Sequence, residues 1–250
     1  MTAALRVLLV GAAGRMGQAI STVAEGADDL VICGRCDKDD NIEKGLSDCD
    51  VVIDFSHADA TEQNCALCVA GRKPIVIGTT GHSHAQTEAI ARAATSIPVV
   101  LAANFSVGVN TLFWLTRKAS DLLGEEFDVE IVETHHRLKK DAPSGTAKRL
   151  AQIVADARGL NLDGDVAHGR QGLIGERPVR QIGMHAIRAG DVVGDHTVLF
   201  ATNGERLELT HKASSRETFA SGALRAARWI VGQSAALYSM EDVLGLSALE

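Results

Sequence analysis

Apolar residues in the first hundred positions occur in short runs separated by helix-like stretches. The runs are residues 5–10, 30–34, 51–55, 75–78 and 99–102, and the helix-like stretches are residues 18–24, 58–70 and 85–94. Runs of this length are typical of strands buried on both faces, and their alternation with helices predicts a parallel, doubly wound sheet. We therefore expect the chain to begin with an α/β domain.

The pattern changes after residue 106. A long amphipathic helix is predicted over residues 109–123, and strands are predicted over residues 127–133, 181–189, 195–201 and 206–212. Asn203 and Gly204, between the last two strands, are a strong hairpin turn signal. One long helix with at least four mostly meandering strands predicts a second domain of the α+β class.

Two further segments complete this division of the chain. Residues 161–178 are rich in glycine and charge and are predicted to form a long mobile loop, or an arm that reaches a neighbouring subunit. A last helix, over residues 218–233, is expected to pack back on the first domain. The predicted domains are therefore residues 1–106 with 216–250, and residues 107–215.

A glycine-rich turn connects the first strand to the first helix. Residues 11–17 (GAAGRMG) place glycines at positions 11, 14 and 17, and Asp37 follows twenty residues after the last of them. In a dinucleotide site the first glycine permits the tight turn, the second lets the pyrophosphate approach, and the third lets the helix pack on the strand. An acid at the spacing of Asp37 accepts hydrogen bonds from the adenosine ribose. The combination favours a Rossmann-like domain that binds NADH or NADPH over a mere tight turn beside an exposed aspartate.

Lys38, next to Asp37, bears on the choice of cofactor. A carboxylate favours the 2′-hydroxyl of NADH, whereas a neighbouring cation can pair with the 2′-phosphate of NADPH. The two together indicate tolerance of either cofactor. Lys38 is equally explained as one charge of the solvated run over residues 37–40.

Small and polar residues follow the later strands of the first domain. Ligands in open α/β sheets bind beyond the carboxyl ends of the strands. Thr79, Thr80, Asn104 and Phe105 are therefore candidates to line the nicotinamide half of the pocket.

The most distinctive stretch lies between the predicted strand 127–133 and a predicted helix over residues 147–158. Residues 135–146 (HHRLKKDAPSGT) bring two histidines and three cations to a Ser-Gly-Thr step at the start of that helix. A helix N-terminus favours an anion, and imidazole and ammonium groups are proton donors. We expect this loop to bind and protonate a small carboxylate. The alternative is a surface loop whose histidines pair with acids such as Glu133.

Composition narrows the class of protein. The net charge of −7 gives no electrostatic support for binding nucleic acid, and no apolar run is long enough for a membrane helix. The chain starts directly with a strand and not with a signal peptide, so we expect a cytoplasmic protein. Its five cysteines include two Cys-x-x-Cys pairs, a possible zinc pattern, but the pairs are far apart and lie among apolar residues. We predict buried thiols and no metal.

Taken together, these motifs resemble bacterial dihydrodipicolinate reductase, also called 4-hydroxy-tetrahydrodipicolinate reductase, of the diaminopimelate and lysine pathway. The resemblance covers nearly the whole chain. One departure is the stretch between Asp37 and Asp54, which is short for the family. The resemblance rests on residues 11–17, 52–56 (VIDFS), 77–81 (IGTTG), 102–110 (AANFSVGVN), 133–147 (ETHHRLKKDAPSGTA) and 211–216 (HKASSR).

The resemblance implies hydride transfer from NADH or NADPH to the imine of a cyclic dicarboxylate, followed by protonation. It implies that His135 is the proton donor and acceptor, that Lys139 is a second donor, and that His136, Gly145 and Thr146 bind the substrate. It also implies a homotetramer assembled through the second, substrate-binding domain. The implied cofactor contacts are Gly11, Ala12, Ala13, Gly14, Arg15, Met16, Asp37, Lys38, Gly78, Thr79, Thr80, Ala102, Ala103, Asn104 and Phe105.

Three alternatives fit the sequence less well. A semialdehyde dehydrogenase needs a nucleophilic cysteine beyond the nucleotide domain, and no cysteine follows Cys68. A reductase like homoserine dehydrogenase leaves the double histidine unexplained. A dinucleotide sensor without turnover gives no reason for His135 and Lys139 to lie in one loop.

Overall fold

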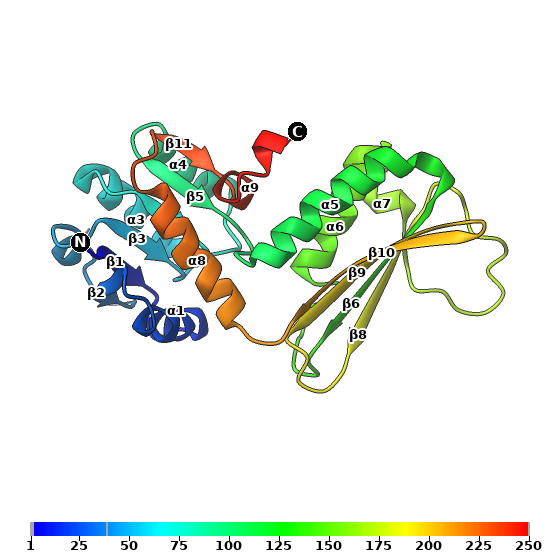
Figure 1. Cartoon of the computed structure of the whole chain (residues 1–250), viewed down its shortest axis with the longest axis horizontal. Helices are drawn as coiled ribbons and strands as arrows, with labels where there is room; N and C mark the ends of the chain where they lie inside the picture. The colour runs from blue at the N-terminus through cyan, green and yellow to red at the C-terminus, as the bar shows by residue number, and fades with distance from the viewer. Residues whose placement is uncertain (1–2, 39, 250) are drawn as a thin grey trace. The chain divides into compact units, whose positions relative to one another are not determined.

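A computed structural model describes residues 3–38 and 40–249, which form two compact units (Figure 1). The first unit contains the chain up to Val107 and again from Arg216, and the second unit is Gly108–Ser215. The domain boundaries expected from the sequence lie within one residue of this division. The chain therefore leaves the first unit once and returns to it for its last helices.

The first unit is built on a six-stranded sheet in the order β11-β5-β4-β3-β1-β2. All neighbouring strands are parallel, as predicted for a doubly wound fold. The strands are β1 (Leu5–Val10), β2 (Leu30–Cys36), β3 (Val51–Asp54), β4 (Ile75–Ile77), β5 (Pro98–Leu101) and β11 (Ala236–Tyr238). The helices are α1 (Arg15–Glu25), α2 (Glu43–Leu46), α3 (Ala58–Gly71), α4 (His84–Ala94), α8 (Glu217–Ile230) and α9 (Met240–Val243), followed by a 3₁₀ turn at Ser247–Leu249.

Alternate residues of the strands pack into two separate cores. Val7, Leu9 and Ile53 face a cluster that includes Ile20 of α1 and Leu224 of α8. Leu8, Val10 and Val52 face the other cluster, with residues of α2, α3 and α4. Because successive side chains of a strand point to opposite faces, the continuous apolar runs in the sequence fill both layers.

The C-terminal segment belongs to the first unit, as the sequence predicted. The α8 helix lies very close to the backbone of Phe105. A Cβ on Gly222 of α8 would be 1.8 Å from the Phe105 carbonyl oxygen. Beyond α8, β11 pairs with β5 and completes the sheet. This short strand was not predicted because three residues carry too little periodic signal to be recognised.

The cysteines of α3 lie in the second core as ordinary apolar residues. Cys65 and Cys68 are buried, and burial raises the pKa of Cys65 to about 11, so its thiol stays protonated at neutral pH. Cys36 and Cys49 are buried as well, so the expectation of buried thiols is correct for these four cysteines, whereas Cys33 of β2 is exposed.

The second unit contains a five-stranded mixed sheet in the order β10-β9-β6-β8-β7. The expected meander is only partly correct, since β9 and β10 form the predicted hairpin but β6 and β8 pair in parallel. The elements are α5 (Val107–Leu123), a 3₁₀ turn (Gly124–Glu126), β6 (Asp128–His135), α6 (Gly145–Arg158), α7 (Leu162–Asp165), β7 (Val166–His168), β8 (Ile182–Arg188), β9 (Gly194–Thr202) and β10 (Glu205–Ala213).

Two helices cover one face of this sheet. The α5 and α6 helices lie side by side (Figure 1), and their buried residues share one core with Val129 and Ile131 of β6 and with Val198 and Phe200 of β9. In the described parts of the chain, no helix is both long and apolar enough to cross a membrane.

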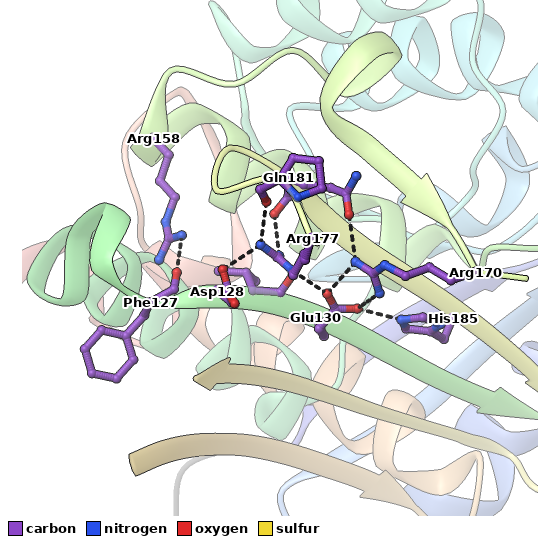
Figure 2. Close-up of polar contacts among 10 residues, drawn as sticks. Phe127, Asp128, Glu130, Arg158, Arg170, Arg177, Gln181 and His185 are labelled. Atoms are coloured by element: carbon purple, nitrogen blue, oxygen red, sulfur yellow. Dashed lines mark hydrogen bonds and ion pairs between the residues drawn. The ribbon is translucent and has the colours of Figure 1, made fainter. Parts of the chain in front are cut away.

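The segment expected as one long loop is partly ordered, because it contains α7 and β7, and its remainder is anchored to the sheet. Glu130 accepts hydrogen bonds from Arg170, Arg177 and His185 at 2.7–2.9 Å (Figure 2). Arg177 also donates to Asp128 and to the carbonyl oxygen of Gln181. These contacts hold the loop at Arg170 and at Arg177 against the face of β6 opposite the helices.

The cations around Glu130 keep it charged. Burial favours its neutral form, but hydrogen bonds from Arg170, His185 and Arg177 outweigh burial and lower the pKa of Glu130 to about 2. The folded-state pKa is below the unfolded value, so the stabilisation is complete above about pH 4.3 and is lost as the pH falls toward 2.

We predict that Glu130→Gln lowers the free energy of unfolding of this unit by about 2 kcal/mol at pH 7, because two guanidinium groups lose a charged acceptor. The difference from wild type should shrink as the pH falls from about 5 to 2, where wild-type Glu130 itself becomes neutral. Trypsin should also cleave faster after Arg170, which loses its ion pair with Glu130. Thermal unfolding across this pH range checks the prediction, with Glu208→Gln, an exposed glutamate of β10, as the control. A constant difference at all pH values would contradict it.

Candidate active site

The turn after β1 has the backbone that its glycines suggest. Gly11 has a φ of 80°, and a Cβ there would lie 2.4 Å from the carbonyl oxygen of Phe55. A Cβ on Gly17 would lie 2.2 Å from the carbonyl oxygen of Gly11. A larger residue at Gly17 would push α1 away from the turn, and one at Gly11 would clash with the backbone after β3. These two glycines therefore bring the helix start close to the end of the sheet.

Gly14 differs from the other two glycines because it faces solvent, although a Cβ on it would be tight against the carbonyl oxygen of Gly11. It is exposed, and the nearest atom to a Cβ built on it is 3.2 Å away. It is also the N-cap of α1, so no side chain at this position caps the first turn. The N–H groups of a helical first turn have no partner within the helix. A long helix that begins with uncapped N–H groups suits a phosphate.

Asp37 lies at the edge of the same turn. Its carboxylate accepts hydrogen bonds from the backbone N–H of Ala13 at 2.9 and 3.2 Å, which fixes the end of β2 against the turn. Asp37, Lys38, Ala13 and Arg15 are exposed, whereas Met16 is half-buried and Ala12 is buried. The structure thus groups the predicted residues of this region, with polar groups of Asp37, Lys38 and Arg15 open to solvent.

A buried carboxylate organises the loops at the ends of β3 and β4. Asp54 is fully buried and accepts hydrogen bonds from Ser56, Asn64 and Thr79. The Thr79 side chain consequently points into this cluster, whereas Thr80 is exposed. The sequence analysis did not assign this role to Asp54, although an acid that ends a continuous apolar strand was a signal for it.

The candidate cofactor residues after β4 and β5 differ in which of their atoms a ligand could reach. A Cβ on Gly78 would lie 2.2 Å from the ring of Phe55, so glycine is required for this packing. Phe105 is 2% exposed and its ring packs against Phe55 at a centroid distance of 5.5 Å. Its side chain is therefore a core residue, which leaves the Phe105 backbone for any ligand. Ala103 is exposed, and Ala102 and Asn104 are half-buried.

In the second unit, β6 places His135 and Glu133 on one face. Odd-numbered residues from Val129 to His135 are buried toward the helices, and the even-numbered residues face the other side. Glu133 is fully buried and His135 is 9% exposed. The Nδ1 atom of His135 lies 2.6 Å from Glu133 Oε2. The alternative interpretation was a surface loop whose histidines pair with acids such as Glu133. His135 does pair with Glu133, but the pair is buried and not at the surface.

Glu133 has donors on both oxygens. Arg188 of β8 donates two hydrogen bonds, at 2.8 and 2.9 Å, and the backbone N–H of Ser144 donates a third at 3.1 Å. Burial favours the neutral form, yet the hydrogen bonds from Arg188, His135 and Ser144 lower the pKa of Glu133. Glu133 is therefore a carboxylate at neutral pH, and His135 must carry a proton on Nδ1 to donate to it.

The charge state of His135 depends on its surroundings. Burial lowers its pKa, Glu133 opposes this change, and Lys139 and Arg188 lower the pKa further. A neighbouring histidine, His196 of β9, meets the His135 ring edge-on at 5.1 Å, and burial lowers the pKa of His196 to about 4. His135 is thus neutral in the free protein, and an anion beside it would favour its protonated form.

Lys139 and His136 lie in the loop that follows. Lys139 is half-buried and forms an ion pair with Asp141 at 2.9 Å. It lies close enough to His135 to influence its charge. His136 is half-buried, and its Nδ1 has no hydrogen-bond partner among the described residues. Lys139, the predicted second donor, and His136, a predicted substrate contact, therefore lie in the loop that follows His135 at the end of β6.

The loop ends at the start of α6. Ser144 is the N-cap, and its hydroxyl oxygen accepts from the backbone N–H of Ala147 at 3.2 Å. Gly145 and Thr146 are the first residues of the helix, and a Cβ on Gly145 would meet nothing within 4 Å. This helix start is open to a ligand, and its dipole favours a negative charge there.

Sequence reasoning named His135, His136, Lys139, Gly145 and Thr146 as candidates but did not name the residues that surround them. These are Arg188, His196 and Gly194, all on strands that are distant in the sequence. Gly194 precedes Asp195, which pairs with Thr134, and a Cβ on Gly194 would lie 3.0 Å from His135 Nε2. The only available signal was Glu133, an acid on the apolar face of an alternating strand.

Family models match both parts of the chain. Residues 5–105 match the model described as dihydrodipicolinate reductase, N-terminus, and residues 108–244 match the model of its C-terminus. The two matches account for nearly all of the sequence and meet at the division between the two units.

Relatives agree with these models over their full lengths. The chain is 55% identical over 245 residues to 4-hydroxy-tetrahydrodipicolinate reductase of Akkermansia muciniphila, covering 98% of this chain and 100% of that protein. It is 47% identical over 264 residues to the protein of the same name from Hahella chejuensis, covering 96% and 99% of the two chains.

A solved structure has the same fold. Dipicolinate-bound dihydrodipicolinate reductase from Paenisporosarcina sp. TG-14 matches with a TM-score of 0.76 and 23% identity, over 94% of this chain and 97% of that one. The parallel six-stranded sheet of the first unit is a Rossmann-type nucleotide-binding fold. On the evidence of both family models and of the two relatives, the chain belongs to the dihydrodipicolinate reductase family.

Proposed function

We propose that the chain is an NAD(P)H-dependent 4-hydroxy-tetrahydrodipicolinate reductase that acts in diaminopimelate and lysine biosynthesis. The observation that supports this most directly is the buried Glu133–His135 pair beside Lys139 and the open start of α6. Membership of the family supplies the reaction class, and the relatives carry this name. The substrate would be a small cyclic imine with two carboxylates, in keeping with the dipicolinate bound by the neighbouring structure.

The first unit fits a nicotinamide dinucleotide. The uncapped start of α1 at Gly14 suits the pyrophosphate, and Asp37 and Lys38 are open to solvent where the adenosine ribose is expected. Gly78, Thr80, Ala102, Ala103 and Asn104, with the backbone of Phe105, follow strand ends where the nicotinamide is expected. When bound, the reduced nicotinamide supplies the hydride.

In this proposal His135 is the proton donor. Its Nδ1 is committed to Glu133, so Nε2 is the nitrogen that delivers a proton to the substrate. A dianionic substrate would raise the low pKa of His135 and so load the donor when it binds. Lys139 would be a second donor once an anion competes with Asp141 for its ammonium group.

The start of α6 would hold one substrate carboxylate. The N–H groups of Gly145 and Thr146, with the Thr146 hydroxyl, are the proposed donors, and His136 is a further contact. Fixed donors near the acceptor also offset the negative charge that hydride delivery builds on the substrate.

Assembly and location are part of the same proposal. The homotetramer implied by the family resemblance would assemble through the second unit. Sedimentation of the purified protein would check this assembly. A cytoplasmic location stays a prediction from the sequence.

We expect His135→Gln to lower kcat by about 10²–10⁴-fold with KM for the imine substrate little changed, because a general acid is removed. Loss of NADH and NADPH absorbance with freshly generated substrate measures this. His84→Gln, an exposed histidine of α4, is the matched control. Near-normal turnover in His135→Gln would refute its role. Cofactor binding without any oxidation by the wild type would instead favour a dinucleotide sensor.

Thr146→Val should raise KM for the substrate by about tenfold while kcat changes little, since it removes one hydrogen bond to a charged carboxylate. Steady-state kinetics separate the two parameters. Thr87→Val, at an exposed position in α4, is the control for loss of a helical hydroxyl. A fall in kcat at unchanged KM would place Thr146 outside the carboxylate site.

Lys38→Ala tests the finer question of the cofactor. If Lys38 pairs with the 2′-phosphate, kcat/KM for NADPH should fall by about tenfold and that for NADH should not. The measurement is the ratio of the two efficiencies in wild type and variant. An unchanged ratio would make Lys38 one more solvated charge.

A further inference from the structure

Glu133 contacts both the predicted proton donor and the cap residue of the predicted anion site. It lies on β6 two residues before His135, is fully buried, and accepts from His135 Nδ1, from Arg188 and from the Ser144 N–H. A buried carboxylate tolerates loss of water only when such donors are complete. Its contacts therefore fix three separate elements, β6, β8 and the start of α6, around one charge.

The contact to His135 selects a tautomer. An ionised carboxylate can only accept, so Nδ1 carries the proton and Nε2 of the neutral ring is left unprotonated. The Nε2 atom lies over Gly194 on β9, where a Cβ would come within 3.0 Å of it. Glycine at this position keeps Nε2 uncovered from the β9 side.

The contact to Ser144 fixes the other half of the site. The same carboxylate that orients His135 holds the N-cap residue of α6, and Ser144 Oγ is also 3.0 Å from Nε2 of buried His196. Arg188 adds a bond to the carbonyl oxygen of Asp141 at 2.6 Å. Both ends of the loop over residues 136–144 are thus tied to one charge pair.

We propose that Glu133 is a positioning residue for the reaction: it fixes His135 with Nε2 toward the substrate and holds the Ser144 cap, so that donor and carboxylate site keep one geometry. This inference rests on the proposed function. It assigns to Glu133 an effect on the proton donor that acts through His135, without contact with the substrate.

The groups that face His135 set the direction of the pH effect. They are Glu133 on its own strand, Arg188 on β8, His196 on β9 and Lys139 in the following loop, with His211 of β10 beside His196. Among them only Glu133 favours the protonated ring strongly. Removing its charge lowers the pKa of His135, so the fall of kcat at high pH moves to lower pH.

The test is Glu133→Gln, because a glutamine amide can accept from Nδ1 or donate to it and no longer selects one tautomer. We expect kcat to fall about 100-fold and KM to stay within about threefold of wild type. Long-range ¹H–¹⁵N spectra of histidine-labelled protein should show Nδ1-protonated His135 in the wild type and a mixed state in the variant. Glu208→Gln, an exposed acid of β10, is the control.

Two measurements keep the test decisive if Glu133→Gln does not fold. The tautomer of wild-type His135 needs no variant, and an Nε2-protonated ring would overturn the proposal. Gly194→Ala adds a methyl against Nε2 without substituting Glu133 or any of its partners, so it should lower kcat about tenfold with little change in KM. Wild-type kcat in Gly194→Ala would also overturn the proposed orientation.

The outcomes separate the two levels of inference. A folded Glu133→Gln with the wild-type tautomer and pH profile would overturn the positioning role. An altered tautomer with unchanged kcat would support the contact and overturn the role of His135 as proton donor, which belongs to the proposed function.

Discussion

The arrangement of the second unit depends on one buried carboxylate, Glu133, which must have hydrogen-bond donors around it. Glu133 has no contact with solvent, and its oxygens are satisfied by a guanidinium, an imidazole and a backbone N–H. Breaking one such bond leaves a buried charge that is expensive to retain. The strand β8, the strand β6 and the start of α6 therefore have little freedom to move apart. A site that must deliver a proton at a defined place gains preorganisation from this constraint.

The first unit contains a comparable device. Asp54 is buried at the carboxyl end of β3 and accepts from side chains of the next loop, of α3 and of the loop after β4. In both units, then, a buried carboxylate near a strand end fixes the loops that are expected to carry ligands. Backbone constraints complete the first site, since Gly11 and Gly17 allow contacts that no side chain would permit.

Much of the fold follows from local patterns. Apolar runs of β1 and β3 predicted a parallel sheet because strands covered on both faces have no polar side. The glycine-rich turn and the Asn203–Gly204 hairpin turn could also be predicted, because each depends on a few neighbouring residues. The parallel pairing of β6 with β8 was not, because alternation shows which face of a strand is buried and does not show its neighbour. The short strands β7 and β11 gave too little periodicity to be seen.

The sequence by itself determined which residues were available for chemistry: the cationic loop with His135 and Lys139, the helix start at Gly145 and Thr146, and the glycine turn with Asp37. Only the tertiary structure decided how these groups are held. Arg188 lies more than fifty residues from His135 along the chain and pairs with it across β6 and β8. Gly194 is also distant in the chain and lies beside the His135 ring. The donors around buried Glu133 keep it an anion, although burial alone would favour its neutral form. The type of each residue is given by the sequence. Its burial and its hydrogen-bond partners depend on contacts between distant segments, and these contacts set the charge and the orientation of His135.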